Sequence, residues 1–209
     1  MITLTYLGHS AFLVKYNNQS FVIDPYQDNS VPGIKFPRVS ANYVFSSHNH
    51  YDHNAIDLVK IEPTNEEFDY DAITVPHDHH NGSERGLNKM YLFRLGNYRV
   101  LFTGDLGCIP DENIINQIRG VDVILAPING FYTISAEELH KIMGLIQPKV
   151  TIPIHYYRKE DNSGYPDGNQ IDIFKSLVGA YLEVNEPTIK IDDELLENKV
   201  VIFNKYYQE

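Results

Sequence analysis

The feature that most constrains the fold of this chain is a series of short apolar runs that each lead into histidine or aspartate. The run "YVFSS" leads into residues 46–54, "SSHNHYDHN", while "ITVP", "VLFTG" and "VTIPI" lead into His77, Asp105 and His155. These runs are rich in β-branched and aromatic residues and therefore predict strands. Side chains that directly follow strands lie on loops, where a rigid scaffold can present them together. The sequence predicts that these polar residues converge at one sheet edge.

The segment 46–54 concentrates metal-binding side chains on one loop. They are His48, His50, Asp52 and His53. Imidazole nitrogen and carboxylate oxygen suit Zn²⁺ and related ions, which take three or four such ligands at ~2.0–2.2 Å. So many ligands on one loop favour two ions rather than one, with His77, Asp105 and His155 completing the set. Taken singly, His77 and His155 are equally well explained as surface-loop residues, but the neighbouring cluster favours the metal interpretation.

Composition places the chain among globular proteins. The 209 residues suit a single domain spanning 1–209, and 43% hydrophobic with 22% charged residues argues against disorder. The net charge of −11 argues against a general affinity for nucleic acid or anionic lipid. Because Cys108 is the sole cysteine and no signal peptide or membrane-spanning run is evident, a cytoplasmic location is expected.

The order of elements predicts a layered α/β domain. Strands are expected at 2–8, 11–16, 20–26, 43–47, 72–76, 122–128 and 150–156, with a hairpin over 89–105 that turns at Gly96-Asn97. A polar, proline-containing stretch covers 27–42. Ser135 and Glu138 form a capping box ahead of an amphipathic helix over 135–146. Beyond residue 171 one further helix and one or two strands are expected.

The same motifs carry a family resemblance. In chain order, "SSHNHYDHN", "VPHDHHNGSERGLN", "VLFTGDLG" and "VTIPIHY" resemble the successive metal motifs of the metallo-β-lactamase-fold hydrolases. "YLGHSAFLV", "FVIDPY" and "APINGFYTIS" are similar to the branch that contains L-ascorbate-6-phosphate lactonase. The resemblance covers residues 2 to about 157 and is specific for the superfamily, not for one substrate. It implies an αβ/βα sandwich of two central mixed β-sheets flanked by helices, with the metals at one edge.

The resemblance also implies which residues bind each ion. The ligands of the first ion would be His48, His50 and His77. The ligands of the second ion would be Asp52, His53 and His155. Asp105 would bridge the two ions, and Asp24 would support the loop without binding metal. Zn²⁺ is the expected ion, with Mn²⁺ or Fe as alternatives, because nitrogen and oxygen ligands do not select among them.

The segment 77–80 offers three histidines for one ligand position. In order of preference they are His77, His79 and His80. His77 leads because the pair His77-Asp78 keeps the spacing to Arg85-Gly86 that is common in this branch. Other side chains are candidates for contacting the substrate or protonating its leaving group. They are His9, His79, Arg85, Cys108, Tyr132 and Tyr156. Core packing is an alternative role for the tyrosines and for Cys108.

The predicted reaction is hydrolysis of a small ester, lactone or phosphoester by a hydroxide that bridges two ions, aligned by Asp52. The substrate is expected to be anionic, because the ions attract oxyanions and Arg85 suits bidentate recognition of phosphate or carboxylate. Arg85 could instead pair with a neighbouring acid and only brace its loop. The loop 158–168 is expected to overhang the site and to supply Arg158 or Lys159 to the same anion.

Two other function classes remain open. One is a nuclease or phosphodiesterase of the same fold, against which the acidic net charge argues. The other is a non-catalytic or redox metal-binding protein, as in diiron members of the fold. The complete ligand set argues against a purely structural site. The expected partner is a small-molecule substrate, with no nucleic acid and no membrane; homo-oligomerisation is left open.

Overall fold

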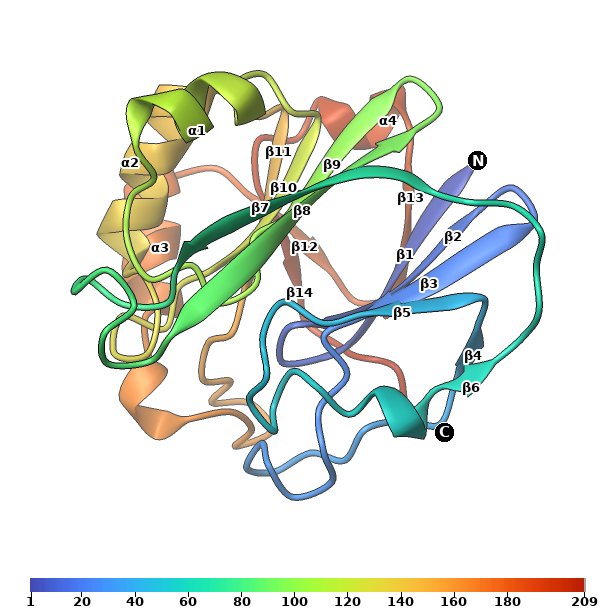
Figure 1. The fold of residues 1–209 in the computed structure, drawn as a ribbon. Coiled ribbons are helices and arrows are strands. Elements are labelled where there is room, and N and C mark those ends of the chain that lie inside the picture. The colour runs from blue at the N-terminus through green and yellow to red at the C-terminus, as the bar shows by residue number, and fades with distance from the viewer. Residues whose placement is uncertain (209) are drawn as a thin grey trace.

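The computed structural model describes residues 1–208 and packs two five-stranded sheets face to face (Figure 1). The first sheet has the order β13 (Thr188–Ile191), β1 (Ile2–Gly8), β2 (Ala11–Tyr16), β3 (Gln19–Ile23), β5 (Tyr43–Phe45). The second has the order β11 (Val150–Ile154), β10 (Val123–Pro127), β9 (Tyr98–Phe102), β8 (Leu87–Leu95), β7 (Asp69–Pro76). Both sheets mix parallel and antiparallel pairs. The predicted sandwich of two mixed sheets is confirmed.

Strand pairing follows the predicted hairpins and adds long-range contacts. β8 and β9 form the expected hairpin, in which Leu95 pairs with Tyr98 across Gly96, whose φ is +65°. Glycine adopts this left-handed backbone at little cost, which is why it suits a two-residue turn. β13 from the tail pairs antiparallel with β1 at the opposite end of the chain. Two small parallel sheets pair β12 (Leu182–Val184) with β14 (Val201–Phe203) and β4 (Ser40–Ala41) with β6 (Lys60–Ile61).

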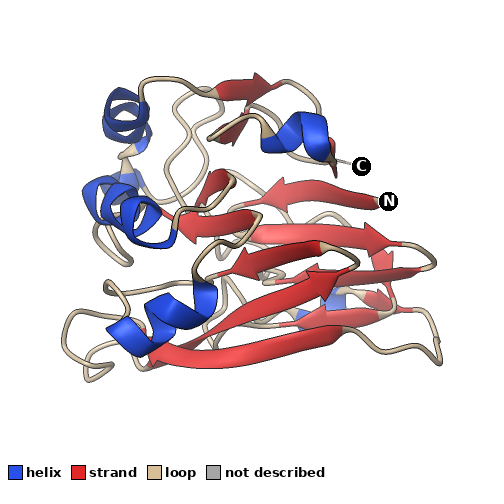
Figure 2. Cartoon of the chain, turned by 90° about the horizontal axis from the view of Figure 1, so that it is seen from above, coloured by secondary structure: helices blue, strands red, loops and turns tan. Residues whose placement is uncertain are grey.

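Helices cover the outer face of the second sheet (Figures 1 and 2). They are α1 (Glu112–Ile118), α2 (Ala136–Ile146) and α3 (Ile171–Val178). The capping box predicted for α2 is present, with the Ser135 side chain accepting from the Glu138 backbone N–H. The tail contains more than expected, since α4 (Asp193–Leu196) and three short strands follow α3. No helix within residues 1–208 is long and apolar enough to cross a bilayer.

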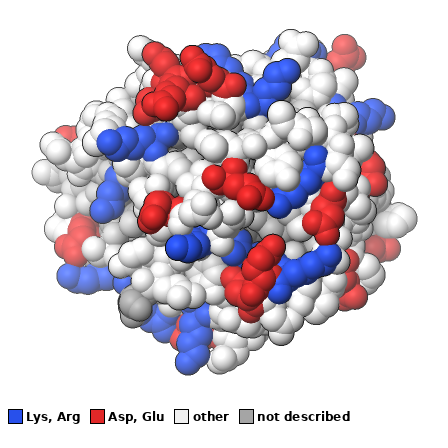
Figure 3. Space-filling view, turned by 180° about the vertical axis from the view of Figure 1, so that it is seen from behind, with Lys and Arg blue, Asp and Glu red and all other residues white. Residues whose placement is uncertain are grey.

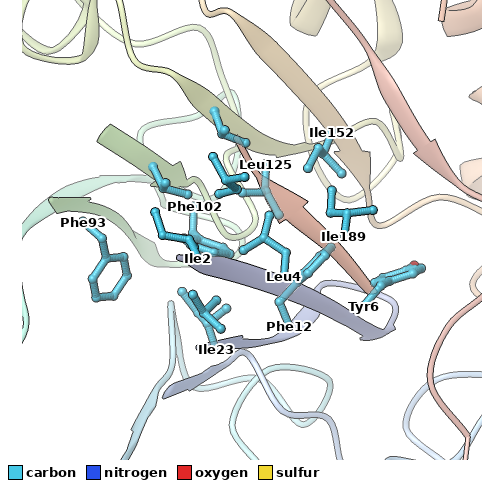
Figure 4. Packing of buried hydrophobic residues seen from close by; sticks show 14 of the residues in the cluster. Ile2, Leu4, Tyr6, Phe12, Ile23, Phe93, Phe102, Leu125, Ile152 and Ile189 are labelled. Carbon is cyan, nitrogen blue, oxygen red and sulfur yellow. The ribbon is translucent and has the colours of Figure 1, made fainter. Parts of the chain in front are cut away.

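The main core lies between the two sheets, where alternate side chains of each strand point inward. From the first sheet come Ile2, Leu4 and Phe12, which in Figure 4 face Phe102 and Leu125 of the second. A second apolar layer lies between the second sheet and the helices α1, α2 and α3. The sandwich is therefore fixed by apolar surface on both faces of the second sheet.

The outer face of the first sheet is covered by the stretch predicted to be a polar loop. Tyr26, Ile34 and Phe36 pack against Leu7 and Val22 on this face. The hydroxyl of Tyr26 donates a hydrogen bond of 2.8 Å to the carbonyl oxygen of Leu7. Short 3₁₀ turns at Ile56–Leu58 and Pro166–Gly168 complete the connections. This stretch carries a buried apolar face despite its polar and proline-rich sequence.

Candidate metal centre

The candidate site lies where alternate strands of both sheets end. β1, β3 and β5 run in one direction in the first sheet, and β7, β9 and β11 share a direction in the second. His9, Asp24, His77 and His155 directly follow β1, β3, β7 and β11. The histidine-rich loop follows β5, and Asp105 follows β9. Chain direction therefore delivers these side chains to one edge, as the sequence predicts.

Asp105 lies at the middle of the cluster. Its Oδ2 atom is 3.1 Å from His53 Nε2, 3.2 Å from His155 Nε2, 3.4 Å from His77 Nε2 and 3.9 Å from His48 Nε2. Two donors that share an ion at ~2.1 Å in tetrahedral geometry lie about 3.4 Å apart. The spacing of these atoms is therefore that of ligands around common ions. Asp105 faces histidines from both of the ion sites that the sequence predicts.

The donor atoms form groups whose members lie within 4.8 Å of one another. One group is His48, His50 and His77. A second group is His9, Asp52, His53 and His155. A third group, His48, His53 and Asp105, connects the first two. The structure thus brings together all seven predicted ligand residues and adds His9 to them.

Unpartnered buried atoms show that the cluster suits a cation. His53 Nε2, His155 Nε2 and Asp105 Oδ1 are buried and have no hydrogen-bond partner within residues 1–208. Burying polar atoms without partners costs free energy. Divalent cations bound among them would satisfy the carboxylate oxygens and the imidazole lone pairs together. The donor set therefore fits the metal ions that the sequence predicts.

The protonation states suit metal binding at some of the predicted ligands and not at others. Burial opposes ionisation of Asp105, but the neighbouring His155 and His53 hold the pKa of this carboxyl well below its usual range. Burial lowers the pKa of His48 to about 2 and that of His9 to about 4. Burial also opposes charge on His53 and His155, yet Asp105 raises the pKa of His53 well above its ordinary value and that of His155 to about 9. A cation would therefore displace protons from His53 and His155.

Asp24 supports the histidine loop from below. Its carboxylate accepts hydrogen bonds from the Ser47 backbone N–H at 2.6 Å and from the Ser47 hydroxyl at 2.9 Å. Ser47 Oγ in turn lies 2.9 Å from His48 Nδ1, and Asp24 Oδ2 lies 3.1 Å from His53 Nδ1. Asp24 thus contacts His53 directly and reaches His48 through the Ser47 hydroxyl.

The backbone is strained at the site. His9, Asp24 and His155 all adopt left-handed φ values, of +56°, +51° and +54°. Such conformations cost about 1–3 kcal/mol each at residues other than glycine and concentrate at functional sites. All three residues stand directly after a strand, where the chain turns sharply to aim a side chain at the cluster.

A cavity of about 330 Å³ opens beside the cluster. It is lined by His50, Asp52, His77, Arg85, Asp105, Tyr132, His155 and Tyr165. The guanidinium of Arg85 lies 5.5 Å from the ring centre of Tyr132 and 3.6 Å from Glu84 Oε2. Arg85 and Tyr132 therefore occupy the position that the sequence predicts for substrate contact.

Tyr165 lines the cavity and is not among the site residues predicted from the sequence. Its hydroxyl lies 2.9 Å from the carbonyl oxygen of Ser30 and 3.2 Å from Asp52 Oδ2, and it can donate to either. The loop after His155 does reach the cavity, as expected, but through this tyrosine. Its position in a glycine- and proline-rich loop next to a predicted ligand was the available signal.

Asp78 organises the loop that carries Arg85. Its carboxylate oxygens accept four backbone N–H bonds, from His80, Gly82, Glu84 and Arg85, at 2.8–3.0 Å. These hydrogen bonds lower the pKa of Asp78 to about 2 against the opposing effect of burial. Asp78 contacts the Arg85 backbone and not its guanidinium, so the side chain of Arg85 stays available to the cavity.

Two of the three competing histidines point away from the cluster. His79 is exposed and its Nε2 lies 2.7 Å from Glu138 Oε1, while His80 Nε2 lies 3.5 Å from Glu84 Oε1. His77 is buried and lines the cavity. The structure therefore brings only His77 of these three into the predicted ligand set, and it leaves His79 without contact to the cavity.

Several side chains that were considered for substrate contact lie away from the cavity. Arg158 is buried, and its guanidinium donates to the carbonyl oxygens of Phe203 at 2.8 Å and Asn204 at 2.6 Å. Lys159 pairs with Asp172 on the surface. Tyr156 packs in the core under the helices, and Cys108 is half-buried outside the cavity lining. Sequence proximity to a ligand does not fix which way a neighbouring side chain points.

Comparison with known proteins agrees with this geometry. Residues 3–155 match the family model described as "Beta-lactamase superfamily domain". A UPF0173 metal-dependent hydrolase of Desulforamulus reducens is 30% identical over 190 residues, which cover 73% of this chain and 83% of that protein. A UPF0173 metal-dependent hydrolase of Natranaerobius thermophilus is 27% identical over 183 residues, 73% of this chain and 82% of that protein. A crystal structure from Thermotoga maritima, described as a candidate Zn-dependent hydrolase of the metallo-beta-lactamase superfamily, is similar with a TM-score of 0.76. It is 25% identical and the match covers 97% of this chain and 98% of that one.

Proposed function

We propose a function for this chain, which belongs to the beta-lactamase superfamily and to its UPF0173 metal-dependent hydrolases. In this proposal the protein holds two divalent ions and hydrolyses a small anionic ester, lactone or phosphoester. The observation that carries the proposal is the position of Asp105. One carboxylate oxygen of this residue lies within 3.1–3.9 Å of four imidazole nitrogens that belong to both donor groups. A carboxylate placed in this way can bridge two ions.

The ligand assignment follows the two donor groups. We propose that the first ion is held by His48, His50 and His77. The second ion would be held by Asp52, His53 and His155, and Asp105 would contact both. Zn²⁺ is the proposed occupant because imidazole and carboxylate ligands suit it, with Mn²⁺ or Fe as alternatives that the same ligands also bind. When bound, two such ions lower the pKa of water toward neutrality and polarise the carbonyl or phosphoryl oxygen of a substrate.

The remaining chemistry is assigned to side chains that line the cavity. Asp52 is aligned by Tyr165, whose hydroxyl lies 3.2 Å from its Oδ2. Arg85 lines the cavity, and its guanidinium lies over the ring of Tyr132. From this position the planar guanidinium can donate two parallel hydrogen bonds to a phosphate or carboxylate. We propose that Arg85 fixes the anionic group while the ester or lactone bond faces the ions.

The size of the cavity supports a small substrate. Its volume of about 330 Å³ is near the lower end of the ~300–1,000 Å³ range of small-molecule sites. We propose small anionic lactones or phosphoesters as occupants, because molecules of this size are compatible with a cavity of this volume. On the face shown in Figure 3, acidic and basic side chains are interspersed and no basic band runs across it. Together with the net charge of −11, this face gives no electrostatic footprint for a nucleic acid.

Activity of the zinc-loaded protein on a panel of chromogenic phosphoesters, lactones and thioesters tests the proposal. We expect turnover of small anionic substrates that is lost with a chelator and restored by Zn²⁺. Asp105→Asn should abolish turnover, while Asp122→Asn, at a buried aspartate that pairs with Lys149 outside the cavity lining, should retain it. Chelator-insensitive turnover, or full activity of Asp105→Asn, would contradict the proposal.

A further inference from the structure

His9 is a buried polar residue whose side chain reaches the second donor group. It lies in the turn between β1 and β2 and is 4% exposed. Its Nε2 atom is 3.2 Å from Asp52 Oδ2, and its ring centre is 4.0 Å from that of His155 and 5.3 Å from that of His53. The donor atoms of these four residues all lie within 4.8 Å of one another. His9 is thus as close to the group as the members that the family pattern supplies.

The backbone holds His9 in this place against strain. Its φ of +56° is left-handed, a conformation that histidine rarely adopts. Its carbonyl oxygen accepts a hydrogen bond of 3.1 Å from the Tyr6 hydroxyl and one of 3.2 Å from the His155 backbone N–H. The second bond ties His9 directly to a predicted ligand. The two-residue turn between the paired Gly8 and Ala11 requires a positive φ at its first position, so the hairpin itself places His9 beside the cluster.

The two donor groups also differ in burial. In the second group His9, His53 and His155 are at most 4% exposed and Asp52 is intermediate, whereas in the first group His77 is buried, His48 is intermediate and His50 is exposed. Closed metal sites are filled by protein ligands, whereas catalytic sites keep a position open for water or substrate. The second group, with three buried histidines, thus matches a filled site better than the first group, which has one.

We propose that His9 is a fourth side-chain ligand of the second ion, which is thereby enclosed and bound more tightly than the first. The inference rests on the proposed two-ion site. His9, Asp52, His53, His155 and the bridging Asp105 would give the second ion five protein ligands. The first ion would have His48, His50, His77 and Asp105, and would keep an open position toward the cavity. The first ion would then be the one that contacts the substrate and exchanges with solution.

Calorimetric titration of the metal-free protein with Zn²⁺ tests the unequal binding. The wild type should bind two ions in separate steps. His9→Asn should weaken the tighter step by about 100-fold or more and leave the weaker step unchanged, since asparagine tolerates the left-handed backbone. His140→Asn, at an exposed histidine of α2, is the matched control and should leave both steps unchanged. If His9→Asn binds Zn²⁺ in the tighter step with the same affinity as the wild type, the proposal is overturned.

Nuclear magnetic resonance of the wild type separates a ligand from a residue that only orients Asp52. In protein loaded with ¹¹³Cd²⁺ and labelled with ¹⁵N-histidine, a ligand nitrogen of His9 couples to cadmium and carries no proton. An orienting histidine would instead keep its Nε2 proton toward Asp52 and show no coupling, and this result would refute the inference. A wild type that binds only one ion would refute the two-ion proposal itself. The two failures are therefore distinguishable.

Discussion

Arg85 offers the most quantitative test of substrate recognition. Its side chain is 29% exposed at the cavity, and its nearest acidic partner is Glu84 at 3.6 Å. Hydrogen bonds from a charged group contribute ~1.5–3 kcal/mol. The exposed pair with Glu84, which the guanidinium must leave to bind an anion, is worth about 0.2–1 kcal/mol. The difference, about 0.5–2.8 kcal/mol, predicts that Arg85→Ala raises KM for an anionic substrate by about 2- to 100-fold.

Steady-state kinetics on an anionic ester and on its neutral counterpart provide the assay. Arg85→Ala should raise KM for the anionic ester only. Glu84→Gln should lower the same KM by up to about fivefold, because it frees the guanidinium from a pair worth up to ~1 kcal/mol. Arg94→Ala is the matched control, since Arg94 pairs with Asp69 and Asp71 at the other end of β8. Equal changes in KM for both esters would refute the assigned role of Arg85.

Three further outcomes follow from the same geometry. His77→Ala should reduce the metal content to one ion per chain. His79→Ala and His80→Ala should leave two ions, because the side chains of His79 and His80 are exposed and face glutamates. Elemental analysis measures the metal content, and the reverse pattern would show that the histidine assignment is wrong. Asp78→Asn should raise KM for anions without changing metal content. The amide cannot accept all four backbone N–H bonds that hold the loop carrying Arg85. Steady-state kinetics measures KM, and an unchanged value would contradict this role of Asp78. Removing the ions should destabilise the fold by about 4 kcal/mol for each ion present at 1,000 times its Kd, which lowers Tm by roughly 8–16 °C per ion. Calorimetry with and without chelator measures the change, and an unchanged Tm would contradict tight binding.

Much of the fold could be predicted because the local residue pattern of most elements favours the strand, turn or helix that the structure contains. The hairpin at Gly96, the capped helix at Ser135 and the apolar runs before the ligands are local signals, and each has the expected structure. The tail was underestimated because its strands are short and depend on distant partners. β13 is stable only through pairing with β1, whose sequence lies at the other end of the chain.

The site shows the same division between local and distant information. The histidine loop and the residues after β7, β9 and β11 could be placed from strand direction alone. The proposed role of His9 depends on the left-handed backbone of its turn, which the neighbouring residues do not predict. The available signal was the presence of a histidine between two apolar strands. Arg158 and Tyr165 lie on one loop, yet only the tyrosine reaches the cavity. Arg158 is held in the core by Phe203, about 45 positions away, and Tyr165 is held at the cavity by Asp52, more than 110 positions away. Neither contact can be predicted from the local sequence.

Anomalous diffraction from zinc-loaded crystals would show whether two ions share Asp105. We expect two zinc peaks about 3.5–4 Å apart, one beside His48, His50 and His77 and the other beside His53 and His155, with the Asp105 carboxylate contacting both. A single peak at saturating Zn²⁺, or two peaks with Asp105 contacting neither or only one, would contradict this expectation.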